Sequence, residues 1–340
     1  MGTHDQYKVA VLSLGGTIAS TPTAGKDGVI PNLTATDLVA SVPELASVGS
    51  IYAEAFLAKP STELTFSDIA SVCKRARELV EAENFDGVVV TQGTDSMEET
   101  SFVADLLWLG EAPLVFTGAM RNPSLAGPDG PGNLLAAVLT ASSRRARNQG
   151  VLVVMNDEIH AARNVKKTNT SSPAAFSSAP TGPIGFVTEK YVSMKAKVDR
   201  WPGLAIPESW NPDVEVVTSK IDGSARLLEI LNQELPAGVV LAGFGGGHVV
   251  TRDVPLIESL AKRIPVLLAS RTGSGRVLET TYGFPGSEID LLGRGVIHAG
   301  DLHPLKVRIL LTVMVSLGWP RDRIASQIAA FGAVASGDVR

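Results

Sequence analysis

Short runs of aliphatic residues alternate with longer amphipathic stretches in the first half of the chain. The runs predict strands at Lys8–Leu14, Ile51–Leu57, Gly87–Thr91, Ala112–Thr117 and Val151–Met155. The amphipathic stretches predict helices at Phe66–Glu83, Met97–Leu109 and Gly132–Arg147. Continuous apolar strands that alternate with helices are typical of a parallel sheet with both faces covered. This pattern therefore predicts a doubly wound, mostly parallel α/β domain.

The alternation stops at Lys195–Pro212, a segment that contains prolines and tryptophans but has no regular spacing, which is typical of a connector. It then restarts, with strands predicted at Val214–Thr218, Ala237–Ala242 and Pro265–Ser270 and helices at Gly223–Gln233, Val254–Lys262, His303–Leu317 and Asp322–Phe331. We therefore expect an N-terminal α/β domain over residues 1–194, a connector over 195–212 and a smaller C-terminal α/β domain over 213–340.

Length and charge narrow the class of protein. A chain of 340 residues favours two domains over one. Its net charge of −5 argues against nucleic acid or an anionic membrane as the main partner. The short basic cluster Arg144–Arg147 is interpreted as cations near a helix C-terminus.

Cysteine usage and the N-terminus bear on the compartment. The single cysteine, Cys73, excludes an internal disulfide, and its place in a predicted helix favours an inert thiol. No apolar run reaches the ~18 residues of a membrane span, and the N-terminus lacks the hydrophobic region of a signal peptide. We therefore expect a cytoplasmic protein without a membrane partner.

Candidate chemistry begins directly after the first predicted strand, at Gly15-Gly16-Thr17. Ligands of open parallel sheets bind outside the carboxyl ends of the strands, and two glycines allow a tight turn that displays Thr17 there. A glycine-rich turn can also hold a phosphate, but neither of the usual nucleotide-binding motifs is present. Alone, the turn favours a threonine that caps a helix.

A second polar group follows another predicted strand. Thr94, Asp95 and Ser96 lie at a strand-to-helix turn, where a simple helix cap is the alternative interpretation. Together with Thr17 they supply a second hydroxyl, a carboxylate and backbone N–H donors at one sheet edge. Acyl transfer needs such a set, because it requires a nucleophile, a proton acceptor and stabilisation of an oxyanion.

A lysine pair, Lys166-Lys167, follows the strand at Val151–Met155. A lysine directed toward the sheet edge can lose its charge and act as a base, although most lysines are solvated surface charges. The histidines are scattered and none lies in a nucleophile elbow. No spacing of His, Cys and carboxylates indicates a metal site, so we expect neither a metal nor another cofactor.

Six motifs in a fixed order carry a family resemblance. They are GGTIA at 15–19, GTDSMEET at 93–100, GAMR at 118–121, DGPGNL at 129–134, VLVVMND at 151–157 and KTNT at 167–170. In this order they resemble the bacterial-type L-asparaginases, a family that includes glutaminase-asparaginases and an amidotransferase subunit that deamidates glutamine. The resemblance covers most of the chain and is strongest up to about residue 190.

The resemblance implies hydrolysis of asparagine to aspartate and ammonia through an acyl-enzyme. Thr17 would be the primary nucleophile, and Thr94, Asp95 and Lys167 would form the second catalytic group, with Lys167 as the proton acceptor. The implied substrate-binding residues are Gly16, Ser61, Thr62, Gly93, Thr94, Asp95 and Glu288.

Two of these residues carry specific implied roles. Ser61 matches the family serine that holds the α-carboxylate of the substrate. Glu288 corresponds to an acidic residue that reaches into the site of a neighbouring subunit. The resemblance therefore implies a homodimer or homotetramer with its sites at the subunit interface.

The chain also departs from the family pattern. Leu14 replaces a common threonine, Gln92 a common histidine, Ser96 a common threonine, Thr62 a common glutamine and Gly246 an asparagine found in some relatives. Relatives usually supply a tyrosine to the nucleophile from a mobile loop. Here that loop is Ser20–Asn32, and two glycines are expected to keep it flexible. It contains no tyrosine, so Thr21 or Thr23 is left as a weaker hydroxyl donor.

Three alternatives remain open at this point. A glutaminase-asparaginase would accept a side chain longer by one methylene. A non-catalytic amino-acid sensor would keep the pocket without the loop tyrosine. An amidotransferase subunit usually has an additional N-terminal domain, whereas this sequence starts directly at the first predicted strand.

Overall fold

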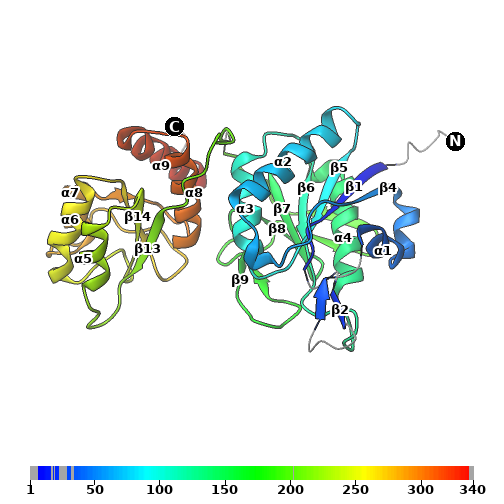
Figure 1. Cartoon of the computed structure of the whole chain (residues 1–340), viewed down its shortest axis with the longest axis horizontal. Helices are drawn as coiled ribbons and strands as arrows, with labels where there is room; N and C mark the ends of the chain where they lie inside the picture. Colours follow the sequence, from blue (N-terminus) through cyan, green and yellow to red (C-terminus); the bar gives the residue numbers. More distant parts are fainter. Residues whose placement is uncertain are drawn as a thin grey trace. The chain divides into compact units, whose positions relative to one another are not determined.

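The computed structural model describes residues 7–16, 18, 20–22, 29–31, 34–201 and 203–336. The chain divides into two units, Met1–Gly203 and Leu204–Arg340, and each is built around its own sheet (Figure 1). Both are α/β units with parallel strands, so the predicted fold class is confirmed.

The sheet of the first unit has eight strands in the order β12-β11-β8-β7-β6-β5-β1-β4. Neighbours are parallel from β7 to β4, whereas β8, β11 and β12 extend the sheet in antiparallel fashion. The strands are β1 (Tyr7–Ser13), β4 (Gly49–Ala55), β5 (Gly87–Thr91), β6 (Leu114–Thr117), β7 (Val151–Met155), β8 (Glu158–Ala161), β11 (Gly185–Thr188) and β12 (Tyr191–Met194).

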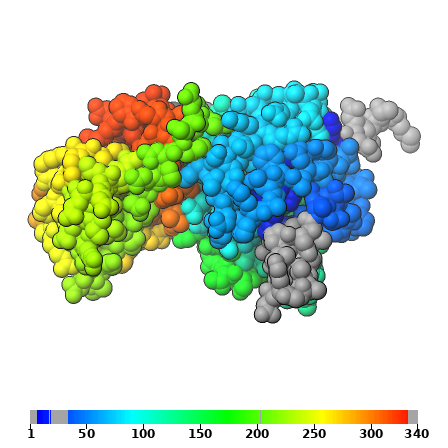
Figure 2. All heavy atoms as spheres, in the orientation of Figure 1, coloured from blue at the N-terminus to red at the C-terminus, as the bar shows by residue number. Residues whose placement is uncertain are grey.

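Helices cover both faces of this sheet (Figure 1). They are α1 (Ala35–Ala40), α2 (Phe66–Glu81), α3 (Met97–Leu107) and α4 (Gly130–Ser142). Helices α1 and α4 pack against one face, in a core that includes Val9 and Val11 of β1. Helices α2 and α3 pack together on the other face, and Figure 2 shows α2 in light blue on the outer surface. Because both faces are covered, strands β5, β6 and β7 are buried along their whole length.

Local signals explain where the helices begin and end. Thr65 caps α2 in a reciprocal capping box with Asp68. Helix α4, predicted to continue to Arg147, ends at Ser142 instead. There Ser143 adopts an extended conformation and its side chain accepts the N–H of Arg145, which starts a separate 3₁₀ turn at Arg144–Ala146.

Two short hairpins complete the first unit. Strands β2 (Ser20–Pro22) and β3 (Val29–Pro31) pair in antiparallel fashion, so the predicted flexible loop Ser20–Asn32 contains ordered β-structure at both ends. Residues 23–28 and 32 lie outside the described residues. Strands β9 (Lys166–Lys167) and β10 (Phe176–Ser177) form the second hairpin, which carries the lysine pair.

The second unit is a smaller α/β domain. Its four parallel strands lie in the order β13 (Val214–Thr218), β14 (Gly238–Gly243), β15 (Val266–Ser270) and β16 (Ile297–His298). Its helices are α5 (Arg226–Gln233), α6 (Val254–Ala261), α7 (Glu288–Gly293), α8 (Pro304–Ser316) and α9 (Arg321–Ser336). Helices α5 and α6 share a core with β14 and β15, and α8 packs along β13 to β15.

Two further observations concern burial and length. The Cys73 thiol is fully buried, and burial raises its pKa to about 12, as expected for an inert thiol. Among the helices of the described residues, none has the length and apolarity needed to cross a membrane.

A buried histidine in β8 predicts sensitivity to acid. Burial lowers the pKa of His160 from 6.5 to about 4, while its Nδ1 lies 2.9 Å from Ser178 Oγ. The unfolded chain therefore binds a proton before the folded chain as the pH falls through 6.5. The contribution of His160 to stability should be constant above about pH 7 and should fall between pH 6.5 and 4, by up to about 3 kcal/mol. Urea unfolding at pH 7.5 and 5 measures this loss.

The matched variant is His160→Gln, which keeps a polar side chain but does not titrate. It should be less stable at pH 7.5 yet lose less of its stability on acidification than the parent. The Glu158 carboxylate lies 3.2 Å from His160 Nε2 and stabilises the charged imidazole. It therefore reduces the stability that the parent protein loses on acidification. Equal pH dependence in the two proteins would show that His160 is not the titrating group.

Candidate active site

The candidate site lies where the carboxyl ends of three neighbouring strands meet. In the register of the sheet, Ser13 of β1 pairs with Ala55 of β4 on one side and with Thr91 of β5 on the other. The segments that leave these strands therefore start at the same edge. This is the arrangement that the sequence pattern predicted for ligand binding.

The glycine turn after β1 is wedged between the other two segments. Gly15 and Gly16 have φ values of 103° and 90°, which favour glycine. A Cβ on Gly16 would lie 2.1 Å from the Gly93 nitrogen, and one on Gly15 would lie 2.8 Å from the Lys59 carbonyl oxygen. Only glycine fits at either position, and Gly16 is thereby held against Gly93.

Ser61 lies on the other side of Gly93. A Cβ on Gly93 would be 2.8 Å from Ser61 Oγ, and Ser61 is buried. The Ser96 hydroxyl donates to the Ser61 carbonyl oxygen over 2.7 Å, which ties the segment after β4 to the start of α3. The structure thus brings together three predicted binding residues, whereas Thr62 is exposed beside them.

Lys167 reaches the same segment from the β9–β10 hairpin. Its Nζ donates to Thr94 Oγ1 over 2.9 Å and to Asp95 Oδ1 over 2.6 Å. Its side chain is 13% exposed and that of Asp95 is 69% exposed, so the ion pair lies at the boundary between protein and solvent. Because side chains alternate along a strand, Lys167 and not its neighbour Lys166 faces this group.

Two residues without a role in the sequence interpretation support this cluster. Glu98 Oε2 accepts the backbone N–H of Lys167 over 2.5 Å, and Gln92 contacts the carbonyl of Gly93. Glu98 lies within the GTDSMEET motif, and Gln92 directly precedes it. A contact between a side chain and a backbone group elsewhere in the fold leaves no periodic pattern in the sequence. The motif GTDSMEET was therefore the only sequence feature that indicated this region.

A partly buried polar network connects the neighbouring loops. Asp129 accepts the N–H groups of Met120 and Arg121. Asn133 donates to the Gly118 carbonyl and accepts the N–H of Asn156. The motifs GAMR, DGPGNL and VLVVMND are therefore linked in space, and their polar residues hold the ends of β6 and β7 together.

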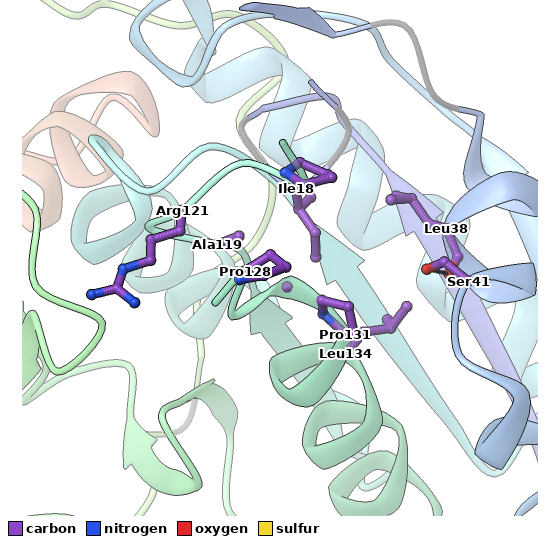
Figure 3. A pocket seen from close by; sticks show the side chains of 10 residues that line it. Ile18, Leu38, Ser41, Ala119, Arg121, Pro128, Pro131 and Leu134 are labelled. Carbon is purple, nitrogen blue, oxygen red and sulfur yellow. Dashed lines mark hydrogen bonds between the residues drawn. The ribbon is translucent and has the colours of Figure 1, made fainter. Parts of the chain in front are cut away.

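Thr17, the predicted nucleophile, lies outside the described residues. The residues on either side are described in part, with Gly16 against Gly93 and Ile18 buried. An apolar cavity of about 100 Å³ lies beside Ile18, and Figure 3 shows Leu38 and Leu134 in its lining. Neither Thr94 nor Lys167 lines it, and its apolar walls do not suit a charged amino acid.

Glu288 lies in the second unit, where its carboxylate is completely buried. It accepts the N–H groups of Thr281 and Tyr282 over 2.8 and 2.6 Å, and its Oε2 lies 3.0 Å from His248 Nε2. Burial alone would raise the pKa of Glu288, but the backbone donors and His248 outweigh it and hold the pKa below its usual range. The carboxylate is therefore charged, and its reach into another subunit stays a prediction.

The site and fold are those of an α/β protein with a Thr94–Lys167–Asp95 cluster at the carboxyl edge of a doubly wound sheet. Residues 8–200 match the family model "Asparaginase, N-terminal", and residues 213–327 match "Glutaminase/Asparaginase C-terminal domain". The chain belongs to the asparaginase family.

Individual relatives agree with this assignment. The glutaminase-asparaginase of Pseudomonas fluorescens biotype A is 31% identical over 91% of this chain and 86% of its own length. L-asparaginase 2 of Escherichia coli K12 is 31% identical over 91% of this chain and 88% of its own. The crystal structure of a probable cytoplasmic L-asparaginase from Campylobacter jejuni has a TM-score of 0.83 at 29% identity and covers 95% of this chain and 99% of that one. The predicted family and enzyme class are thereby confirmed.

Proposed function

We propose that this protein hydrolyses L-asparagine to L-aspartate and ammonia, with Thr17 as the nucleophile. The observation that carries the proposal is the contact of Lys167 Nζ with Thr94 and Asp95. Thr94 directly follows Gly93, and Gly16 packs against Gly93. Thr17 follows Gly16 directly in the sequence, and we propose that its hydroxyl acts at the edge of the sheet that carries the Lys167 cluster.

The first step transfers the acyl group to the protein. The Thr17 oxygen forms a bond to the side-chain amide carbon of asparagine, and backbone N–H groups near Gly93 and Thr94 stabilise the oxyanion. The carbon–nitrogen bond then breaks, and the nitrogen leaves as ammonia after it takes up a proton. In the second step, water attacks the ester and returns the hydroxyl of Thr17.

The second catalytic group moves the protons. Lys167 acts as proton acceptor once its amine is neutral, and Thr94, 2.9 Å from Nζ, relays the proton or orients the attacking water. Asp95 uses Oδ1 for Lys167, which leaves Oδ2 for the α-ammonium group of the substrate. Ser61 binds the α-carboxylate, with Gly16, Thr62 and Gly93 around it.

The proposal extends to assembly and compartment. We place the protein in the cytoplasm as a homodimer or homotetramer, in which Glu288 of one protomer borders the site of its partner. Neither nucleic acid nor a membrane is part of the proposal.

The first test is ammonia release from asparagine, glutamine and the D-isomers of both. We expect kcat/KM for L-asparagine to exceed that for L-glutamine by about 10-fold or more, since one methylene changes the free energy of the transition state by ~1–3 kcal/mol. Equal values would favour a glutaminase-asparaginase, the activity named for the Pseudomonas fluorescens relative. Tight aspartate binding without ammonia release would favour an amino-acid sensor and contradict the proposal.

A further inference from the structure

Gln92 is a buried amide directly beside the proposed reaction centre. It follows the last residue of β5, is 0% exposed and precedes Gly93. The backbone N–H of Gln92 donates to the Thr117 carbonyl oxygen over 3.1 Å. A Cβ on Gly118 would lie 2.6 Å from the carbonyl oxygen of Gln92. The backbone of Gln92 is therefore clamped against the end of β6.

The side chain of Gln92 bridges two partners. Its Nε2 donates to the Gly93 carbonyl oxygen over 2.9 Å, and its Oε1 accepts from the Thr100 hydroxyl over 2.9 Å. Because a carbonyl oxygen only accepts, the Gly93 contact fixes which end of the amide carries the nitrogen. Thr100, on α3, thereby connects the helix to the turn that precedes it.

The contact sets the direction of a peptide group. In a trans peptide the C=O and N–H point in opposite directions. Since Gln92 holds the Gly93 carbonyl from the buried side, the N–H of Thr94 points away from Gln92. In the described part of the chain, that N–H donates to no protein acceptor, although the Thr94 side chain is buried and bound to Lys167.

We propose that Gln92 is a positioning residue that aims the Thr94 N–H at the developing oxyanion. The inference rests on the proposed function, in which Thr17 attacks the amide carbon beside this donor. A donor that is already oriented needs no reorganisation when charge appears in the transition state, so its effect falls on the chemical step. Within the described residues, the side chain of Gln92 bonds to Gly93 and Thr100, so the role we assign to it is to position the turn and not to react.

The experiment compares Gln92→Leu with Thr100→Val in the ammonia-release assay. Gln92→Leu removes the donor to Gly93, and Thr100→Val removes the hydroxyl that holds the amide. We expect kcat to fall about tenfold or more in Gln92→Leu and less in Thr100→Val, a smaller loss than the ~10²–10³-fold for deletion of an oxyanion donor. The KM for asparagine and the Kd for aspartate should stay within about twofold.

Thr140→Val is the matched control for Thr100→Val. Thr140 is also a buried helical threonine whose hydroxyl bonds to the carbonyl four residues earlier, but it has no contact with Gln92. It should keep its kcat. Equal losses of kcat in both valine variants, or a change in KM that matches the change in kcat, would mean that Gln92 has only a structural role.

Gln92→Glu supplies a readout that a structural role would not produce. An ionised carboxylate cannot donate to the Gly93 carbonyl, whereas a protonated one can. The activity of Gln92→Glu relative to the parent should therefore rise as the pH is lowered, and a constant ratio would overturn the proposal. If the parent itself releases no ammonia, the proposed function is wrong. If the parent is active and Gln92→Leu keeps its kcat, only the role of Gln92 is wrong.

Discussion

Thr17→Ala is expected to release no measurable ammonia from asparagine while it keeps the fold and the binding of aspartate. Without the hydroxyl no acyl-enzyme forms, and Thr94 and Lys167 have no ester to hydrolyse. The loss of a hydroxyl nucleophile should lower kcat by about 10⁴-fold or more. The measurement is ammonia release at saturating asparagine, with circular dichroism and an aspartate titration on the same sample.

The geometry around Gly16 is the physical reason for this expectation. Gly16 packs directly against the Gly93 nitrogen, in a conformation that only glycine adopts easily. Thr17 follows Gly16 directly in the sequence, and we propose that its hydroxyl acts beside the Thr94–Lys167 pair.

Thr17→Ser is the informative companion variant. Serine keeps the hydroxyl but loses the methyl group that restricts its rotamers, so this variant should retain part of the activity. Full activity in Thr17→Ala would remove Thr17 from the mechanism and make Thr94 the next candidate for the nucleophile.

The loop after the predicted nucleophile departs from the family pattern, which predicts either a different activation of Thr17 or a modest turnover. The segment Ser20–Asn32 has no tyrosine, and the sequence predicts that Thr21 or Thr23 supplies a hydroxyl in its place. Thr21 belongs to β2, where it pairs with Ile30 of β3, and Thr23 lies outside the described residues. The backbone of Thr21 is therefore held in a hairpin, which makes Thr21→Val the first variant to examine for a role in activation.

Among the strands that position the site, β1, β5 and β7 were predictable from their buried aliphatic runs, Val9–Leu12, Val88–Val90 and Val151–Met155. Such runs are typical of parallel strands covered on both faces once helices separate them. The turns after these strands were predictable because glycines and small polar residues end each aliphatic run. Thr94, Asp95 and Lys167 were found in this way, with the family motifs deciding between Lys166 and Lys167.

The antiparallel extension and the supporting contacts were not predictable. Strands β8, β11 and β12 have four residues each, too few for a periodic pattern to separate them from loops. Glu98 bonds to a backbone group 69 positions away, and such a contact depends on the folded path of the chain. The burial of Glu288 was also missed, because its partners Thr281, Tyr282 and His248 are brought together only by the fold of the second unit.

Lys167→Met is expected to lower kcat by several orders of magnitude while the protein stays folded. Methionine keeps the length of the side chain but removes the amine that contacts both Thr94 Oγ1 and Asp95 Oδ1. The loss of general base catalysis contributes ~10²–10⁴-fold, and Asp95 also loses the cation that orients it. Steady-state kinetics on asparagine gives the size of the effect.

Two further variants separate the possible roles of the lysine. Lys166→Met changes the preceding residue of β9, whose side chain points to the opposite side of the strand, and it should keep most of the activity. Lys167→Arg keeps the positive charge but cannot give up its proton. If the amine is the proton acceptor, Lys167→Arg should be about as inactive as Lys167→Met. Substantial activity in Lys167→Arg would instead mean that position 167 contributes only its charge to Asp95 and Thr94.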